Sequence, residues 1–320
     1  MASLTDEYLV GDEKSYAGGL NWMPMEIATR IRTAVWFNDF TNHSDFDETN
    51  DWETLDVGTS PTTTAYIPTF DFSRHGTLLL TTRDDANAGV QTQRVKSIDI
   101  SKIHSVGDKG TAFWQPRPHT KSAFGARFRV ATNALSDMAF YVGLNAPRDY
   151  DATPTTFAVL DPVTFLPPAI GNVGFWKKPD DENLYFTARN STSAQTSLAM
   201  FPMPNFVIGS NTNYVDVVCR LDANGVTDPI PTDVNYSAYY GLSQIGSSVA
   251  SSNPKSRLEA SNRDHMDWHA VPDPDGDMLD IANHGRFAPA ISVIGQTTAS
   301  QGLAIDYFWI AQERTNEPAQ

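Results

Sequence analysis

The chain has 320 residues, of which 40% are hydrophobic and 11% aromatic, so it can form a sizeable folded core and is not a disordered chain. Its 38 acidic residues outnumber the 23 basic ones, which gives a formal net charge of -15. Because a chain of this charge repels nucleic acid and anionic lipid, it argues against both as partners. We interpret the charge as a source of solubility rather than as an acidic binding surface.

Cys219 is the only cysteine, so the chain has no internal disulfide. It lies in the apolar run 215–221, where we expect a small buried hydrophobic residue rather than a catalytic thiol. No apolar run approaches the ~20 residues of a transmembrane helix, and the N-terminal sequence lacks the basic and apolar regions of a signal peptide. We therefore expect synthesis in a cytoplasm, with any export as part of a larger assembly.

Residues 1–33 are predicted to form an N-terminal arm separate from a β domain that spans 34–320. Acidic residues of the arm alternate with aromatic ones, and its large rings include Tyr8, Tyr16 and Trp22. The alternatives are a frayed terminus, packing against the domain, and a contact with a neighbouring subunit or a capsid. The aromatic side chains favour a contact.

Short strands separated by turns account for the pattern of the remaining chain. They are predicted at residues 35–40, 76–82, 90–95, 124–130, 139–144, 173–177, 184–189, 214–221, 266–271, 278–282, 290–295 and 303–314. No segment has the length and period of a convincing helix. This set predicts an all-β sandwich of two antiparallel sheets.

Strict alternation is clearest at residues 124–130, which predicts a half-buried strand. We expect its partner to be the strand at 139–144, joined to it by a polar connection at 133–137. Asn224 and Gly225 predict a hairpin turn after residue 221. The polar segment 226–263 is then predicted to be a protruding loop or contact element. The acidic stretch 45–56 is predicted to be a hydrated loop.

The last strand, 303–314, is predicted to lie at the centre of a sheet. One alternating set is entirely apolar and comprises Leu303, Ile305, Tyr307, Trp309 and Ala311. The other set becomes apolar in its second half. A strand buried on one face and largely on the other is typical of a stacked-sheet core.

The order of these segments resembles the concanavalin A-like (laminin-G-like, glucanase-like) jelly-roll sandwich of tailed-bacteriophage virion proteins, especially capsid decoration proteins. The resemblance covers residues 34–314, without the arm and the segment 226–263. The matching segments are 36–40, 76–82, 87–91, 124–130, 140–144, 172–176, 183–188, 214–225, 287–294 and 303–310.

This resemblance implies a non-enzymatic structural protein on the surface of a phage virion. The implied function is capsid decoration, with the arm and loops binding the outer surface of the head. The implied partners are the major capsid protein and further copies of this chain in a homotrimer.

The same fold includes glycoside hydrolases, whose motif in the resembling glucanases is Glu-x-Asp-x-x-Glu on one strand. Retaining hydrolysis requires two carboxyl groups about 5–5.5 Å apart. Asp99 in residues 97–101 and Asp306 in the last strand both lack the accompanying glutamates. No catalytic residue is therefore predicted, and Asp306 is interpreted as a charge at a strand edge or a partner of an arginine.

A calcium loop is the one metal site that the sequence suggests. Asp273, Asp275 and Asp277 alternate around Gly276, but the twelfth position of the loop is His284 instead of the glutamate of an EF-hand. A turn with solvated carboxylates is the preferred interpretation. The seven histidines show no His-Glu-x-x-His motif, so no zinc site and no other cofactor are predicted.

Carbohydrate binding, on a virion tail or on the capsid surface, is the alternative function. Trp114 and Trp268 lie in polar or loop contexts, where their rings would stack on sugars. Trp176 follows Phe175 and is expected to belong to the core.

Overall fold

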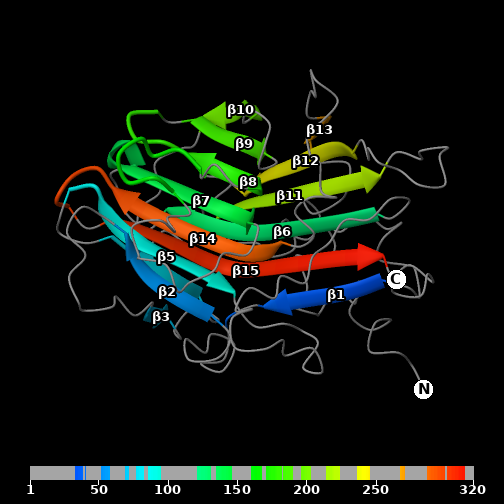
Figure 1. Cartoon of the computed structure of the whole chain (residues 1–320), viewed down its shortest axis with the longest axis horizontal. Coiled ribbons are helices and arrows are strands. Elements are labelled where there is room, and N and C mark those ends of the chain that lie inside the picture. Colours follow the sequence, from blue (N-terminus) through cyan, green and yellow to red (C-terminus); the bar gives the residue numbers. More distant parts are fainter. Residues whose placement is uncertain are drawn as a thin grey trace.

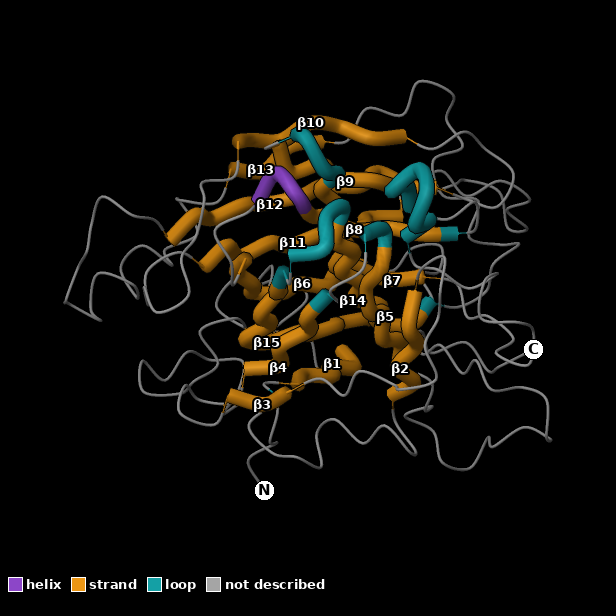
Figure 2. The backbone as a smooth tube through the Cα atoms, turned by 90° about the vertical axis from the view of Figure 1, so that its left-hand side faces the viewer, coloured by secondary structure: helices purple, strands orange, loops and turns teal. Residues whose placement is uncertain are grey.

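The computed structural model describes residues 33–38, 40, 52–57, 69–71, 77–82, 86–94, 121–130, 135–145, 160–167, 171–181, 183–189, 196–202, 214–223, 236–245, 267–270, 287–299 and 301–313. Apart from one 3-10 turn at Leu135–Asp137, the regular structure of these residues is β-strand (Figure 2). No helix among them is long and apolar enough to cross a membrane.

The larger sheet, sheet A, has eight strands in the order β13-β12-β11-β6-β15-β4-β3, with β1 also paired to β15 (Figure 2). These strands are β1 (Thr33–Asn38), β3 (Thr69–Asp71), β4 (Thr77–Thr81), β6 (Lys121–Val130), β11 (Tyr214–Ala223), β12 (Tyr236–Ile245), β13 (Asp267–Ala270) and β15 (Gly302–Glu313).

The smaller sheet, sheet B, has seven strands in the order β10-β9-β8-β7-β14-β5-β2. These strands are β2 (Trp52–Val57), β5 (Ala88–Arg94), β7 (Met138–Asn145), β8 (Asn172–Lys177), β9 (Asn183–Arg189), β10 (Thr196–Pro202) and β14 (Ala288–Gly295). All strand pairs in both sheets are antiparallel, and the chain alternates between the sheets from β4 to β7. The prediction of an all-β, two-sheet jelly-roll sandwich is confirmed.

Four strands, β2, β3, β10 and β12, were not predicted, and the predicted strand at 278–282 lies outside the described residues. The expected pairing of 124–130 with 139–144 is wrong. β6 pairs with β11 and β15, whereas β7 pairs with β8 and β14 in the other sheet. Alternation identifies the buried face of a strand but not its partner, and here the chain crosses from one sheet to the other.

The segment 226–263 is not only a protruding loop, because residues 236–245 form β12. This strand pairs with β11 along its whole length, from Ala223 opposite Tyr236 to Tyr214 opposite Ile245. The connection is therefore longer than a tight Asn-Gly hairpin. The acidic stretch 45–56 is likewise not all loop, because its residues 52–56 belong to β2, which pairs with β5. In both segments, frequent polar residues hid the strand.

β15 is central in sheet A, as predicted, but its faces differ from the prediction. The register against β6 passes from Ile305 opposite Phe128 to Tyr307 opposite Arg127, so Asp306 is the extra residue of a β-bulge. A bulge reverses the alternation that follows it. The inter-sheet core accordingly contains Leu303, Ile305, Phe308 and Ile310, whereas Tyr307, Trp309 and Ala311 are buried outside that cluster.

Phenylalanine rings from both sheets fill the space between them. Phe124 stacks on Phe308 within sheet A at 6.0 Å between centroids and meets Phe175 of sheet B edge-on at 6.1 Å. Phe128 and Phe140 make a second edge contact across the sheets at 5.4 Å. Each such pair adds about 0.5–1.5 kcal/mol to the free energy gained from burial. Cys219 also lies in this core, fully buried, which confirms that expectation, and burial raises the pKa of its thiol.

Gly125 allows Trp309 to lie against the backbone of the neighbouring strand. The two residues are direct partners in the ladder between β6 and β15, and Trp309 is fully buried. A Cβ atom at Gly125 would lie 2.5 Å from Cε2 and Nε1 of the indole. Any side chain at this position would force the ring to move.

Gly125→Ala is therefore expected to lower the free energy of unfolding by about 1–3 kcal/mol, through overpacking against Trp309. Urea denaturation measures the change. The same substitution in a Trp309→Leu background is the control and should cost less, because the clashing ring is absent. An equal loss in both backgrounds would contradict this explanation.

Candidate functional site

The outer face of sheet B is the surface on which the structure concentrates polar and aromatic side chains. Along its central strands, every second residue enters the inter-sheet core, as Val142, Phe175, Phe186 and Ile291 do. The intervening residues point outward. They are Ala139, Tyr141, Gly143 and Asn145 on β7, Asn172, Gly174 and Trp176 on β8, Asn183, Tyr185, Thr187 and Arg189 on β9, and Ala288, Ala290, Ser292 and Ile294 on β14. None of these positions carries a carboxylate.

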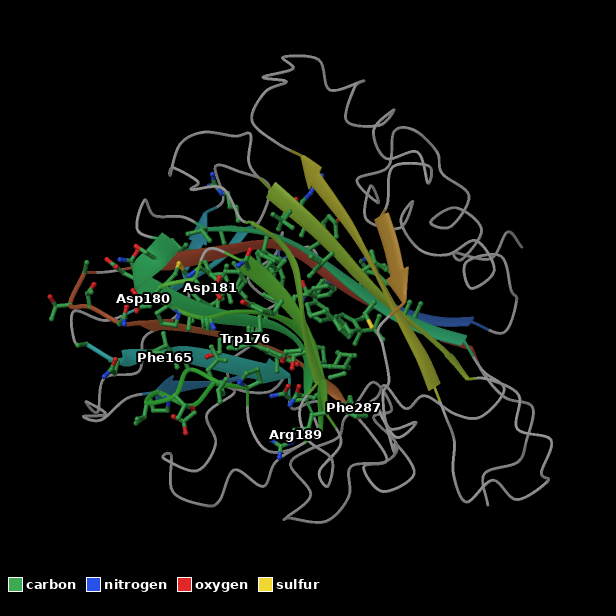
Figure 3. All side chains as sticks on the ribbon, turned by 90° about the horizontal axis from the view of Figure 1, so that it is seen from above. Phe165, Trp176, Asp180, Asp181, Arg189 and Phe287 are labelled. Atoms are coloured by element: carbon green, nitrogen blue, oxygen red, sulfur yellow. The ribbon has the colours of Figure 1, made fainter. Side chains whose placement is uncertain are left out.

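Three aromatic residues form one row across this face, with Tyr141 opposite Trp176 and Trp176 opposite Tyr185. Leu160 and Phe165, from the segment 160–167, pack on this row. The indole of Trp176 donates from Nε1 to the carbonyl oxygen of Phe165 at 2.9 Å, and the two residues lie together in Figure 3. Trp176 is buried, as predicted, but it belongs to this outer cluster and not to the core between the sheets.

Residues 161–166 form a compact turn over the aromatic row. Phe165 N donates to Asp161 O at 2.8 Å, and Asp161 N donates to Leu166 O at 2.9 Å. The Asp161 carboxylate accepts from the amides of Val163 and Thr164 at 2.7 and 2.8 Å. Partial burial opposes ionisation of this carboxyl, but the amide hydrogen bonds outweigh it and lower the pKa. The turn therefore supplies most of its own hydrogen bonds.

Two adjacent glycines, Gly143 and Gly174, form the next row. The hydroxyl of Tyr141 lies over both, since a Cβ atom on either glycine would be 2.7 Å from it. This hydroxyl donates to the carbonyl oxygen of Leu144 at 3.0 Å. Burial raises the pKa of Tyr141 well above its usual value, so the hydroxyl remains a neutral hydrogen-bond donor.

Asp181 organises the end of β8 and β9 nearest the aromatic row. Its carboxylate accepts hydrogen bonds from the Tyr185 hydroxyl and from the backbone and side-chain amides of Asn183, and Lys178 Nζ lies 3.3 Å away. Partial burial raises its pKa, but these donors outweigh that effect and lower it from 3.8 to about 2. A carboxylate held this firmly in its ionised form is an anchor rather than a proton donor.

A polar row closes the opposite end of the face. Asn145, Asn172 and Arg189 are consecutive partners across β7, β8 and β9, and Arg189 lies far from Asp181 in Figure 3. Two atoms of this row are buried without a hydrogen-bond partner in the part of the chain that the structure describes, Asn145 Oδ1 and Arg189 Nε. The same holds for Ser292 Oγ, which lies two rows away. Buried atoms of this kind are normally satisfied by ordered water or by a ligand.

The carboxylates whose side chains are described all have a partner within the scaffold. Asp306 pairs with Arg127 at 3.3 Å, which confirms its predicted role as the partner of an arginine, although β15 is central and not an edge strand. Asp137 accepts from Ser136, and Asp180 accepts from Gln296. Asp161 and Asp181 are engaged as described above. No metal-ligating cluster of three or more acidic, histidine or cysteine side chains occurs among the described residues.

Most predicted site residues fall outside the described residues. These are Tyr8, Tyr16, Trp22, Trp114, Asp273, Asp275 and Asp277, and Asp99, which the sequence already excluded as catalytic, also lies outside them. Trp268 lies on β13, an edge strand of sheet A, opposite Gly241. It is therefore not on the sheet that carries the polar row. Sequence analysis missed Tyr141, Asn145 and Arg189, whose only signal is their alternation with core residues on β7 and β9.

No protein-family model matches the chain, and no curated protein does. Among solved structures, the endo-1,3-β-glucanase of Streptomyces sioyaensis is 12% identical, with a TM-score of 0.47, and the match covers 89% of this chain and 98% of that one. The CBM2 module of the evolved Dit of Lactobacillus casei BL23 phage J-1 is 9% identical, with a TM-score of 0.43 and coverages of 90% and 99%. Peanut lectin is 11% identical, with a TM-score of 0.41 and coverages of 89% and 99%. These likenesses concern the arrangement of strands and assign no activity.

The anchoring role of Asp181 predicts a specific acid response. Because its pKa in the folded protein lies below the ordinary value, its contribution to stability is complete above about pH 4 and is lost as the pH falls toward 2. Asp181→Asn should therefore be less stable than the natural chain at pH 7, and the difference should shrink between pH 4 and pH 2. Urea denaturation across this range measures it. A difference independent of pH would exclude this role.

Proposed function

We propose that this protein is a non-catalytic structural component of a tailed-phage virion that decorates the outer surface of the head. The observation that carries the non-catalytic part is the outer face of sheet B, where none of the outward positions on the four central strands is acidic. Retaining and inverting hydrolysis both need two carboxyl groups on either side of the bond that is cleaved. Glycoside hydrolysis is therefore the weakest alternative for this fold.

In this proposal the sandwich is a rigid platform, and the arm of residues 1–33 binds the major capsid protein and neighbouring copies. The aromatic side chains of the arm supply apolar anchors of the kind that dominate protein interfaces. The net charge of -15 keeps many copies soluble before assembly. A homotrimer at a three-fold axis of the head is the arrangement that the family resemblance suggests.

Deleting residues 1–32 tests this function, because the truncated chain begins at β1 and keeps every described strand. The truncated protein should give the far-ultraviolet circular dichroism of a folded β protein but should no longer sediment with capsids that lack the decoration. The full-length chain is the matched control. Normal capsid binding by a folded truncation would contradict the role of the arm.

Carbohydrate binding is the second candidate, and the polar row of sheet B favours it. Asn145 is 2% exposed and Ser292 is fully buried, yet each has an oxygen without a partner among the described residues. Arg189 Nε, in the same row as Asn145, adds a donor without a partner among the described residues. Amide, hydroxyl and guanidinium groups on one sheet face are suited to the hydroxyl groups of a sugar.

A glycan array distinguishes the two places where a sugar would bind. If the polar row binds it, Arg189→Ala should abolish any signal and Arg220→Ala, which changes an arginine of β11 in the other sheet, should keep it. If the ring of Trp268 binds it instead, Trp268→Ala alone should abolish the signal. A folded natural chain that binds no glycan on the array would remove this candidate and leave the decoration proposal intact.

A further inference from the structure

We propose that β10, the last strand of sheet B, is an interface through which two copies of this chain associate. β10 has a single partner, β9, among the described residues, and no other described strand occupies its outer row of backbone N–H and C=O groups. Unpaired edges of this kind template pairing with a further strand. The proposal is independent of the capsid function.

Comparison of the edge strands identifies β10 as the one best suited to pairing. β3 and β13 have only three and four residues, and both contain an aspartate. β2 carries Glu53 and Asp56. β10 has seven residues and no charged side chain. Short length and charge are two of the features by which proteins protect their edges, and β10 lacks both, although it has two others, a β-bulge and a proline at its last position.

β1 is also uncharged and has one described partner, β15, but its end is covered. Asn38 is 6% exposed, and Phe40, just beyond it, is fully buried. The one residue of β10 whose exposure is described, Ser197, is by contrast exposed. β10 also lies at the upper border of the molecule in Figure 1, at the end of the sheet.

A second copy of the chain fits this edge because an antiparallel strand pairs with itself about a two-fold axis. Such an interface uses the same residues on both subunits and closes after two copies. In a chain of net charge -15, copies repel one another, so an uncharged edge is where they can approach at the lowest cost. The bulge between Ala199 and Phe201 and the proline at position 202 limit the paired length.

The register between β10 and β9 favours a dimer in which the two copies of sheet B form one continuous sheet. Leu198 lies opposite Phe186, and Phe201 lies opposite Leu184; Phe186 and Leu184 belong to the inter-sheet core. Pairing of two β10 strands would thus join two seven-stranded sheets into one sheet of fourteen strands, seven from each copy. One strand pair buries less than a standard interface, so we expect a dissociation constant on the order of 10 μM.

Analytical ultracentrifugation of the full-length chain across about 1–100 μM tests the proposal. The natural chain should pass from monomer to dimer. Ser197→Lys places one like charge from each copy beside the junction and should weaken dimerisation by about tenfold or more. Ala86→Lys is the matched control, because Ala86 is exposed, lies just before β5 far across sheet B, and receives the same charge.

Disulfide formation provides a second measurement that does not depend on weakening the contact. Cys219 is buried, so an exposed cysteine added to the chain is the reactive one. Ala199→Cys should give a covalent dimer under mild oxidation and Ala86→Cys should not. A monomeric natural chain at all concentrations would overturn the proposal. So would an oligomer, trimeric or other, that Ser197→Lys leaves unchanged, which is the result expected if only the arm joins the copies.

Discussion

The bulge at Asp306 is the constraint on which the arrangement of sheet A depends. Before the bulge, β15 pairs with β4 through residues 302–305, and after it β15 pairs with β1 through residues 308–313. β6 runs along the other side of β15 through both halves. The bulge separates the part of β15 that pairs with β4 from the part that pairs with β1 on the same side. The Arg127 guanidinium beside it neutralises the charge of Asp306. The reversed alternation then directs Phe308 onto Phe124 in the core.

The predictable part of the fold is the part that local alternation controls. Residues 124–130 were identified as a strand because apolar and polar residues alternate there, and one face of this strand does enter the core. The partners of this strand were not predictable, because the choice between sheets is decided by contacts among segments distant in the sequence. The bulge at Asp306 was missed for a related reason. In an uninterrupted apolar run such as 307–311, the sequence does not show which alternate residues face the core. β12 was hidden by its serines and glycine, although tyrosines at 236, 239 and 240 mark it as a strand.

The candidate site shows the same limit. The outward residues Tyr141, Asn145 and Arg189 are ordinary in the sequence and become a set only when β7, β8 and β9 are laid side by side. Asp181 was equally inconspicuous, because its role comes from donors that the turn after β8 gathers around it. By contrast, the absence of a glutamate pair could be judged from the sequence, since that motif lies within one strand. Composition and spacing thus bear on the reaction class, whereas residues that would recognise a ligand can be identified only when the order of the strands in the sheet is known.

The central place of β15 also bears on the order in which the protein can fold during synthesis. It follows all other described strands in the chain, yet β1, β4 and β6 all pair with it. On the ribosome these three strands would emerge long before the strand that joins them. The seven strands of sheet B are complete once β14 has emerged, so sheet B can assemble while sheet A is still divided into three parts, β13-β12-β11-β6, β4-β3 and β1. Until translation passes residue 313, the apolar edges of β4 and β6 remain open, which makes the nascent chain a natural client for chaperones.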